Sequence, residues 1–89
     1  MNFRLCDTVE MMFSDDYKKR FVAEYVQTKI RYKKLHRMTT KYEAGTLDFE
    51  PQCSLELLKE QKMHMGNYIH TLEVRAEIEN ILLLSLIHI

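Results

Sequence analysis

Residues 17–42 read YKKRFVAEYVQTKIRYKKLHRMTTKY, and the architecture can be predicted from the pattern in this stretch. It contains neither glycine nor proline, and bulky side chains recur along it at alternating steps of four and three. That spacing is typical of the buried seam of a coiled-coil-like helix. The seam consists of Phe21, Tyr25, Thr28, Tyr32, Leu35, Thr39 and Tyr42. The pattern predicts a helix over about residues 15–43, with Ser14 and the two acids after it at its start.

Residues 44–53 break this pattern and are predicted to form a loop. Gly45 suits a left-handed helix cap, whereas Pro51 cannot lie in a helix interior. We expect the apolar Leu47 and Phe49 to hold the loop against the helices.

A second run with the same spacing follows the loop and consists of Leu58, Gln61, Met65, Tyr68, Leu72, Arg75, Glu79 and Leu82. It predicts a helix over about residues 54–84 that begins at Ser54 or Cys53. Gly66 lies inside it and is tolerable where it permits a close helix crossing.

Two helices of similar length joined by one short loop predict an all-α fold, an antiparallel two-helix hairpin. The hairpin makes a single domain over residues 1–89, with a short N-terminal segment and an apolar C-terminal tail, residues 81–89. A lone hairpin leaves half of each apolar stripe in water. We therefore expect a homo-oligomer.

Length and composition indicate a cytoplasmic protein. The N-terminus turns acidic at Asp7, before any apolar core of signal-peptide length, and the nine-residue tail is too short to span a bilayer. Cys6 and Cys53 have no CxxC spacing, so both are predicted to be buried or half-buried small hydrophobes.

Charge is strongly polarised along the chain although the net charge is zero. Nine Lys or Arg residues and one acid lie between Tyr17 and Tyr42, whereas the 47 residues that follow carry three basic and eight acidic ones. Tyrosines are interleaved with these cations, a mixture that suits phosphates and flat rings. The alternative is a solvated face balanced by acids on the second helix, in ion pairs worth about 0–1 kcal/mol each.

Polar residues in the second seam allow two interpretations. Gln61, Tyr68 and Arg75 either pair across the hairpin or between subunits, or face a ligand cleft, because a buried polar group needs a partner. In the first helix, Tyr25 with Lys29 and Tyr32 with His36 are i, i+4 pairs that share a face.

No catalytic or metal-binding pattern is present. The histidines belong to no metal motif, and the sequence has no glycine-rich phosphate loop and no nucleophile elbow. We therefore expect no metal, no cofactor and no enzymatic activity.

Three stretches carry a resemblance to a known group of proteins. They are residues 31–38 (RYKKLHRM), residues 41–49 (KYEAGTLDF) and the Leu57–Leu58, Gln61, Met65, Tyr68, Leu72, Arg75 pattern. Over about residues 17–81 the chain resembles small phage and prophage proteins, and more loosely the helical-hairpin phage sponges of CBASS and Thoeris defence. This resemblance implies a small cytosolic homo-oligomer that holds a cyclic nucleotide or a cyclic ADP-ribose isomer between hairpins without cleaving it. The second helix begins CSLE, where those sponges carry a Ser-Arg-Glu-like start, so no ligand residue is carried over.

The working hypothesis is a phage-type anti-defence protein that sequesters a nucleotide second messenger. We expect three tyrosines, Tyr25, Tyr32 and Tyr68, to contact the ring of the ligand. Three cations, Lys29, Lys41 and Arg75, would contact phosphate. His36 and Gln61 would bind the polar edges of a base or ribose. The alternative is a protein-binding module that inhibits a host protein or adapts a phage complex. Nucleic acid is an unlikely partner because the acidic second helix would repel a long polyanion.

Overall fold

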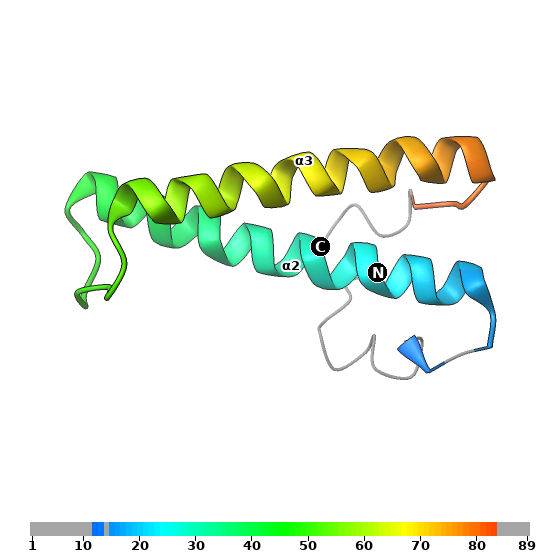
Figure 1. Cartoon of the computed structure of the whole chain (residues 1–89). Helices are drawn as coiled ribbons and strands as arrows, with labels where there is room; N and C mark the ends of the chain where they lie inside the picture. Colours follow the sequence, from blue (N-terminus) through cyan, green and yellow to red (C-terminus); the bar gives the residue numbers. More distant parts are fainter. Residues whose placement is uncertain (1–11, 14, 84–89) are drawn as a thin grey trace.

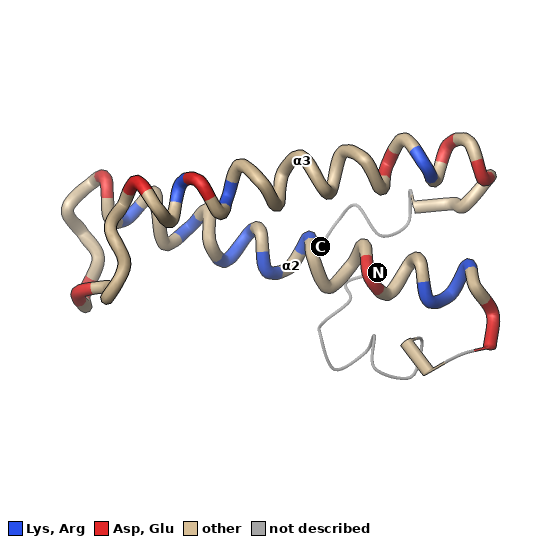
Figure 2. Tube along the Cα trace, in the orientation of Figure 1, with Lys and Arg blue, Asp and Glu red and all other residues tan. Residues whose placement is uncertain are grey.

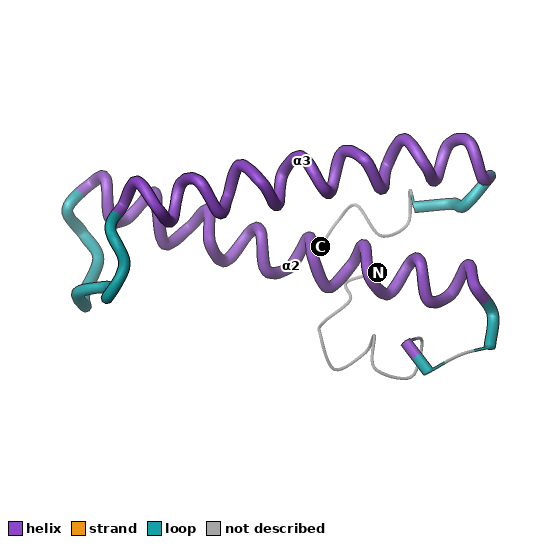
Figure 3. Tube along the Cα trace, in the orientation of Figure 1, coloured by secondary structure: helices purple, strands orange, loops and turns teal. Residues whose placement is uncertain are grey.

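The computed structural model describes residues 12, 13 and 15–83, and two long helices dominate this part of the chain. Helix α2 spans Tyr17–Ala44 and helix α3 spans Leu55–Glu79. The helices lie side by side and contact each other along their length (Figure 1). No strand occurs among the described residues (Figure 3). The predicted all-α fold with two packed helices is therefore confirmed.

Short-range hydrogen bonds define both ends of α2. Asp16 caps the N-terminus, and its side chain accepts a hydrogen bond from the Lys18 backbone N–H at 2.9 Å. At the C-terminus Gly45 adopts a φ of 74°, and the Thr46 N–H donates to the Lys41 carbonyl at 2.9 Å. This is the left-handed cap predicted for Gly45, a conformation that glycine adopts without steric cost.

Helix α3 begins as predicted but ends earlier. Ser54 caps it by accepting a hydrogen bond from the Leu57 N–H at 3.2 Å. It ends at Glu79 rather than at residue 84, because Asn80 takes a left-handed φ of 58°. The chain then turns back, and Ile81 and Leu83 pack into the core. The rest of the tail and most of the N-terminal segment lie outside the described residues.

The seam predicted for α2 faces α3. Phe21, Tyr25, Thr28, Leu35 and Thr39 are buried, and the other two members are half-buried. The first seam is therefore confirmed, including its two threonines, one of which (Thr39) donates its hydroxyl to the His36 carbonyl at 3.0 Å.

The seam predicted for α3 is partly wrong. The buried residues of α3 are Leu58, Ile69, Leu72 and Ala76. Gln61, Tyr68 and Arg75 are exposed, one position away from the buried line. A step of one residue turns the helix by about 100°, so these three side chains lie beside the interface and not within it. Leu58 and Leu72 belong to both lines, which is why spacing alone did not separate them.

Two loop residues also differ from expectation. Phe49 is 56% exposed, so only Leu47, which is half-buried, lies against the rest of the protein. Cys53 is an exposed free cysteine, not a buried one. It precedes the Ser54 cap, where the chain lies outside the helix pair. Cys6 lies outside the described residues.

Candidate functional site

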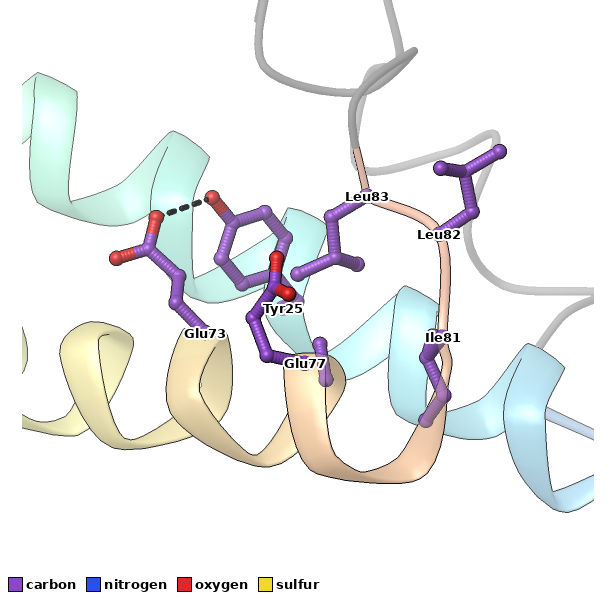
Figure 4. Close-up of a pocket in the computed structure, with 7 residues that line it drawn as sticks. Tyr25, Glu73, Glu77, Ile81, Leu82 and Leu83 are labelled. Atoms are coloured by element: carbon purple, nitrogen blue, oxygen red, sulfur yellow. Dashed lines mark hydrogen bonds between the residues drawn. The ribbon is translucent and has the colours of Figure 1, made fainter.

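A hollow of about 220 Å³ lies where the end of α3 turns back over α2. Its lining combines apolar side chains with carboxylates and one phenol (Figure 4): Tyr25, Glu73, Ala76, Glu77, Ile81, Leu82 and Leu83. The Tyr25 hydroxyl donates to Glu73 Oε2 at 2.9 Å. Lys29 Nζ lies 4.0 Å from the same oxygen and 5.8 Å from the centre of the Tyr25 ring. The predicted pair Tyr25 and Lys29 therefore shares one carboxylate.

Burial controls the chemistry of Tyr25. Desolvation, followed by the hydrogen bond to Glu73 and the charge of that carboxylate, raises the pKa of Tyr25 to about 12. At neutral pH the phenol is a hydrogen-bond donor and cannot serve as a base.

A second cluster joins the first turn of α2 to the last turn of α3. Arg75 donates through Nε to Glu79 at 2.9 Å and through a terminal nitrogen to the Tyr17 hydroxyl. Tyr17 in turn donates to Glu79 at 2.6 Å, and the guanidinium lies 4.9 Å from the centre of the Phe21 ring. Hydrogen bonds from Tyr17 and Arg75 lower the pKa of Glu79. Arg75 is thus already satisfied within the chain.

Tyr68 lies on the same side of the helix pair as Arg75. Its hydroxyl donates to Glu24 Oε1 at 3.3 Å, and Thr28 donates to the same oxygen at 3.3 Å. Desolvation and the nearby Glu24 carboxylate raise the pKa of Tyr68. The interpretation that polar residues pair across the two helices is therefore confirmed for Tyr68 and Arg75. Gln61 is exposed beside Tyr68 in a separate, shallow hollow.

Tyr32 and His36 form a stacked pair farther along α2. Their ring centres lie 6.4 Å apart, with an interplanar angle of 5°. The Tyr32 ring also lies against Gly66, where an added Cβ would be 3.4 Å from Tyr32 Cε2. A methyl group at residue 66 would thus meet the Tyr32 ring at ordinary contact distance. Tyr32 also lines a hollow of about 340 Å³ with residues of α3.

Only some of the Lys and Arg side chains of α2 lie near an acidic side chain. Cations lie along the second half of α2 (Figure 2). Lys29 lies near Glu73, but the cations of this second half are exposed and form no ion pair with another described residue. These residues are Arg31, Lys33, Lys34, Arg37 and Lys41. These five cations are thus solvated, as the alternative expects, but they are not paired with acids on α3.

The eight predicted ligand residues do not converge on one cavity of a single chain. Tyr25 with Lys29, and Tyr68 with Arg75, lie on opposite sides of the buried seam. Lys41 lies at the loop end of α2, where its carbonyl caps the helix. The sequence analysis named acids of the second helix as possible partners of the basic face, but it did not assign Glu24, Glu73 or Glu79 as the specific partners of these residues.

Neither a metal site nor a membrane-spanning helix occurs in the described part of the chain. No group of three or more His, Cys, Asp or Glu side chains that could hold a metal ion occurs there. None of the helices found in residues 15–83 is long and apolar enough to cross a membrane.

Comparison with known proteins gives one match. A family model described as Sequestin matches residues 15–78, a span that includes α2 and nearly all of α3. No curated protein and no solved structure matches the chain.

Proposed function

Because the chain belongs to the Sequestin family, we propose that it binds and sequesters a nucleotide immune signal without cleaving it. The family name implies sequestration, which requires a binding protein and no catalytic group. The proposed ligand is of the cyclic oligonucleotide or cyclic ADP-ribose type. The proposed setting is the host cytosol, where a phage-type protein would remove the signal of CBASS or Thoeris defence.

The unpaired basic half of α2 is the observation that carries this proposal. Five exposed cations lie within residues 31–41 without an ion pair to any described acid. Nucleotide phosphates would supply the missing negative charge, and Arg and Lys are the side chains that bind them most often. The stacked Tyr32 and His36 rings lie beside these cations, within reach of an attached base.

Assembly of antiparallel hairpins would bring the dispersed ligand residues together. In this proposal Tyr32 and Tyr68 stack on the ligand rings, while the buried Tyr25 lines the pocket. Lys29, Lys41 and Arg75 contact phosphate, and His36 and Gln61 read polar edges. Lys29 and Arg75 would exchange Glu73 and Glu79 for phosphate, so part of the binding energy offsets these lost contacts.

A thermal-shift screen tests the proposal. The purified chain is heated with cyclic dinucleotides, cyclic trinucleotides, cyclic ADP-ribose isomers and linear ADP-ribose, and the recovered ligand is examined by chromatography. A ligand at 100 times its dissociation constant should stabilise the fold by about 2.7 kcal/mol. Intact recovery supports sequestration, whereas a cleaved product would contradict it.

Lys41 and Lys59 form a matched pair of variants for the same screen. Both are exposed lysines near the loop end of the helix pair, but Lys59 is paired with Glu43 at 2.7 Å. Lys41→Ala should weaken ligand binding by about tenfold, the effect of losing one phosphate contact worth about 1.4 kcal/mol. Lys59→Ala should leave binding nearly unchanged. Equal effects would mean that general charge, and not a defined contact, determines binding.

The exposed loop favours the second candidate, a protein-binding module. Phe49 is 56% exposed although it is large and apolar, and it lines a hollow at the loop with Tyr42, Leu47 and Pro51. A flat nucleotide screen, together with a stable host-protein complex that Phe49→Ser abolishes, would favour this function over sequestration.

A further inference from the structure

A hollow of about 340 Å³ lies between α2 and α3, where Tyr32 meets Gly66. Small-molecule sites in proteins typically measure about 300–1,000 Å³, so this hollow has room for about one nucleotide unit. It belongs to a single chain and requires no second hairpin. One lining residue, Tyr32, comes from α2, and the others come from α3: Lys59, Lys62, Met63, Gly66 and Asn67.

The Tyr32 ring gives this hollow a flat aromatic surface that is held in place. The ring packs against the hydrophobic core and is stacked with His36, their centres 6.4 Å apart. It also lies against Gly66, which has no side chain that could cover it. Because the ring is positioned before a ligand arrives, stacking a base on it costs little side-chain entropy.

Lys62 brings to the hollow a positive charge without an ion pair to any described acid. Its side chain is half-buried, yet no carboxylate of the described residues lies within ion-pair distance. Lys59, and to a lesser extent Lys62, lowers the pKa of Glu43, but the Glu43 carboxylate is bound by Lys59 at 2.7 Å. Lys59 is thus already paired, and Lys62 is the cation that an anion in the hollow would stabilise.

Asn67 provides an amide at the exposed edge of the hollow. The hydrogen bond that Asn67 accepts from the Thr71 hydroxyl at 3.0 Å uses its backbone carbonyl and not its side chain. A side-chain amide has both a donor and an acceptor, and it can pair with two neighbouring groups of adenine at once. Adenine is therefore the base that suits this hollow best.

Charge distinguishes this hollow from two others on the helix pair. The corner at the end of α3 is lined by Glu73 and Glu77, and the shallow hollow beside Tyr68 is lined by Glu60. These carboxylates would repel a phosphate. The hollow at Gly66 has two lysines and no acid among its lining residues.

We propose that this hollow binds one adenosine phosphate unit within a single hairpin, with adenine stacked on Tyr32 and paired with Asn67 and the phosphate bound by Lys62. The inference rests on the proposed function and deepens it, because it names the part of a nucleotide signal that one chain recognises alone. It adds Lys62 and Asn67 to the expected ligand residues. It also predicts that the chain binds AMP, which has both parts and no cyclic linkage.

Titration of the full chain with AMP, followed by the NMR signals of the backbone amides, tests this site. AMP should shift the signals of Lys62, Gly66 and Asn67. Adenosine and ribose 5-phosphate should each bind at least about tenfold more weakly, because each lacks one of the two parts. GMP should also bind more weakly than AMP. Absence of AMP binding, shifts confined to other residues, or equal affinities for AMP and GMP would overturn the proposal.

Two lysine variants separate a defined contact from general charge. Lys62→Met keeps much of the apolar stem but removes the ammonium group, and it should weaken AMP binding about tenfold. Lys19→Ala removes an exposed lysine in the first turn of α2, outside the lining of the hollow, and should leave AMP binding unchanged. Equal effects of the two variants would overturn the proposal.

Gly66→Ala gives a result that a loss of folding cannot imitate. The new methyl group would lie 3.4 Å from the Tyr32 ring, in space that the base requires. This variant should bind AMP more weakly although its stability in urea is at least that of the wild type. Undiminished AMP binding by Gly66→Ala would overturn the proposal.

Failure of this site and failure of sequestration give different results. If a cyclic nucleotide stabilises the wild type and Lys62→Met equally, sequestration stands and this site is overturned. If no cyclic nucleotide binds, but AMP shifts the signals of the hollow and Lys62→Met weakens that binding, the site stands without sequestration.

Discussion

Replacing Gly66 with alanine should stabilise the protein by about 0.5–1 kcal/mol. Gly66 lies in the interior of α3, where alanine is favoured over glycine by about 0.8–1.0 kcal/mol. The new Cβ would meet its nearest neighbour, Tyr32 Cε2, at 3.4 Å, with two more ring atoms at 3.8 and 3.9 Å. Attraction between carbon atoms is greatest at about 3.5–4.0 Å, so the contact is nearly neutral and most of the helix gain remains.

A side chain larger than alanine at residue 66 should lower the free energy of unfolding. Valine adds two methyl groups beyond Cβ, beside the Tyr32 ring. Overpacking of this kind typically costs about 1–3 kcal/mol. Gly66→Val should therefore destabilise the protein even though Gly66→Ala stabilises it.

Gly45→Ala provides the control for backbone effects. No atom lies within 4 Å of a Cβ added at Gly45, but its φ of 74° is left-handed. Alanine there should cost about 1–2 kcal/mol through backbone strain alone. Gly66→Ala should therefore raise the free energy of unfolding, whereas Gly45→Ala should lower it.

Urea unfolding followed by far-UV circular dichroism measures these differences. Each variant is examined at two chain concentrations, because association would make the apparent stability concentration-dependent. The comparison requires that the slope of unfolding free energy against urea concentration is the same for all variants. Destabilisation by Gly66→Ala of more than about 0.5 kcal/mol would show that Tyr32 cannot yield and would refute the reasoning.

Two further predictions concern pH. Because the folded pKa of Tyr25 is raised to about 12 from 10.0, its stabilising contribution is complete below pH 10 and is lost as the pH rises towards 12. Tyr25→Phe should remove up to about 1.4 kcal/mol per pH unit from the alkaline slope of unfolding free energy, and an unchanged slope would contradict the burial of this phenol. Glu79 has a pKa lowered by Tyr17 and Arg75 from 4.5, so its contribution is present above pH 4.5 and is lost as the pH falls through the folded value. Glu79→Gln should flatten that acid limb, and equal acid midpoints for wild type and variant would argue against the cluster.

The secondary structure of this protein follows largely from local chemistry. Ser54 accepts a backbone hydrogen bond, and Gly45 tolerates a positive φ, whatever the rest of the chain does. The uninterrupted step of four and three from Phe21 to Tyr42 likewise leaves one face for burial. Each of these signals depends on residues within a few positions of one another. Each can therefore be recognised in the sequence without knowledge of the tertiary contacts.

The face that α3 buries was decided by tertiary packing. Two lines of similar spacing run along α3, and only the close approach of Tyr32 to Gly66 and the burial of Ile69 and Ala76 select one of them. Asn80 ends the helix where the tail can fold back over Tyr25, a contact between distant parts of the chain. The contacts of Tyr25 with Glu73 and of Tyr68 with Glu24 join the two helices, so spacing within one helix does not reveal them. Arg75 and Glu79 are an i, i+4 pair within α3, which the sequence does show. Sequence spacing fixes which residues share a helix face, but the rotation of one helix against another depends on side chains fitting together across the interface.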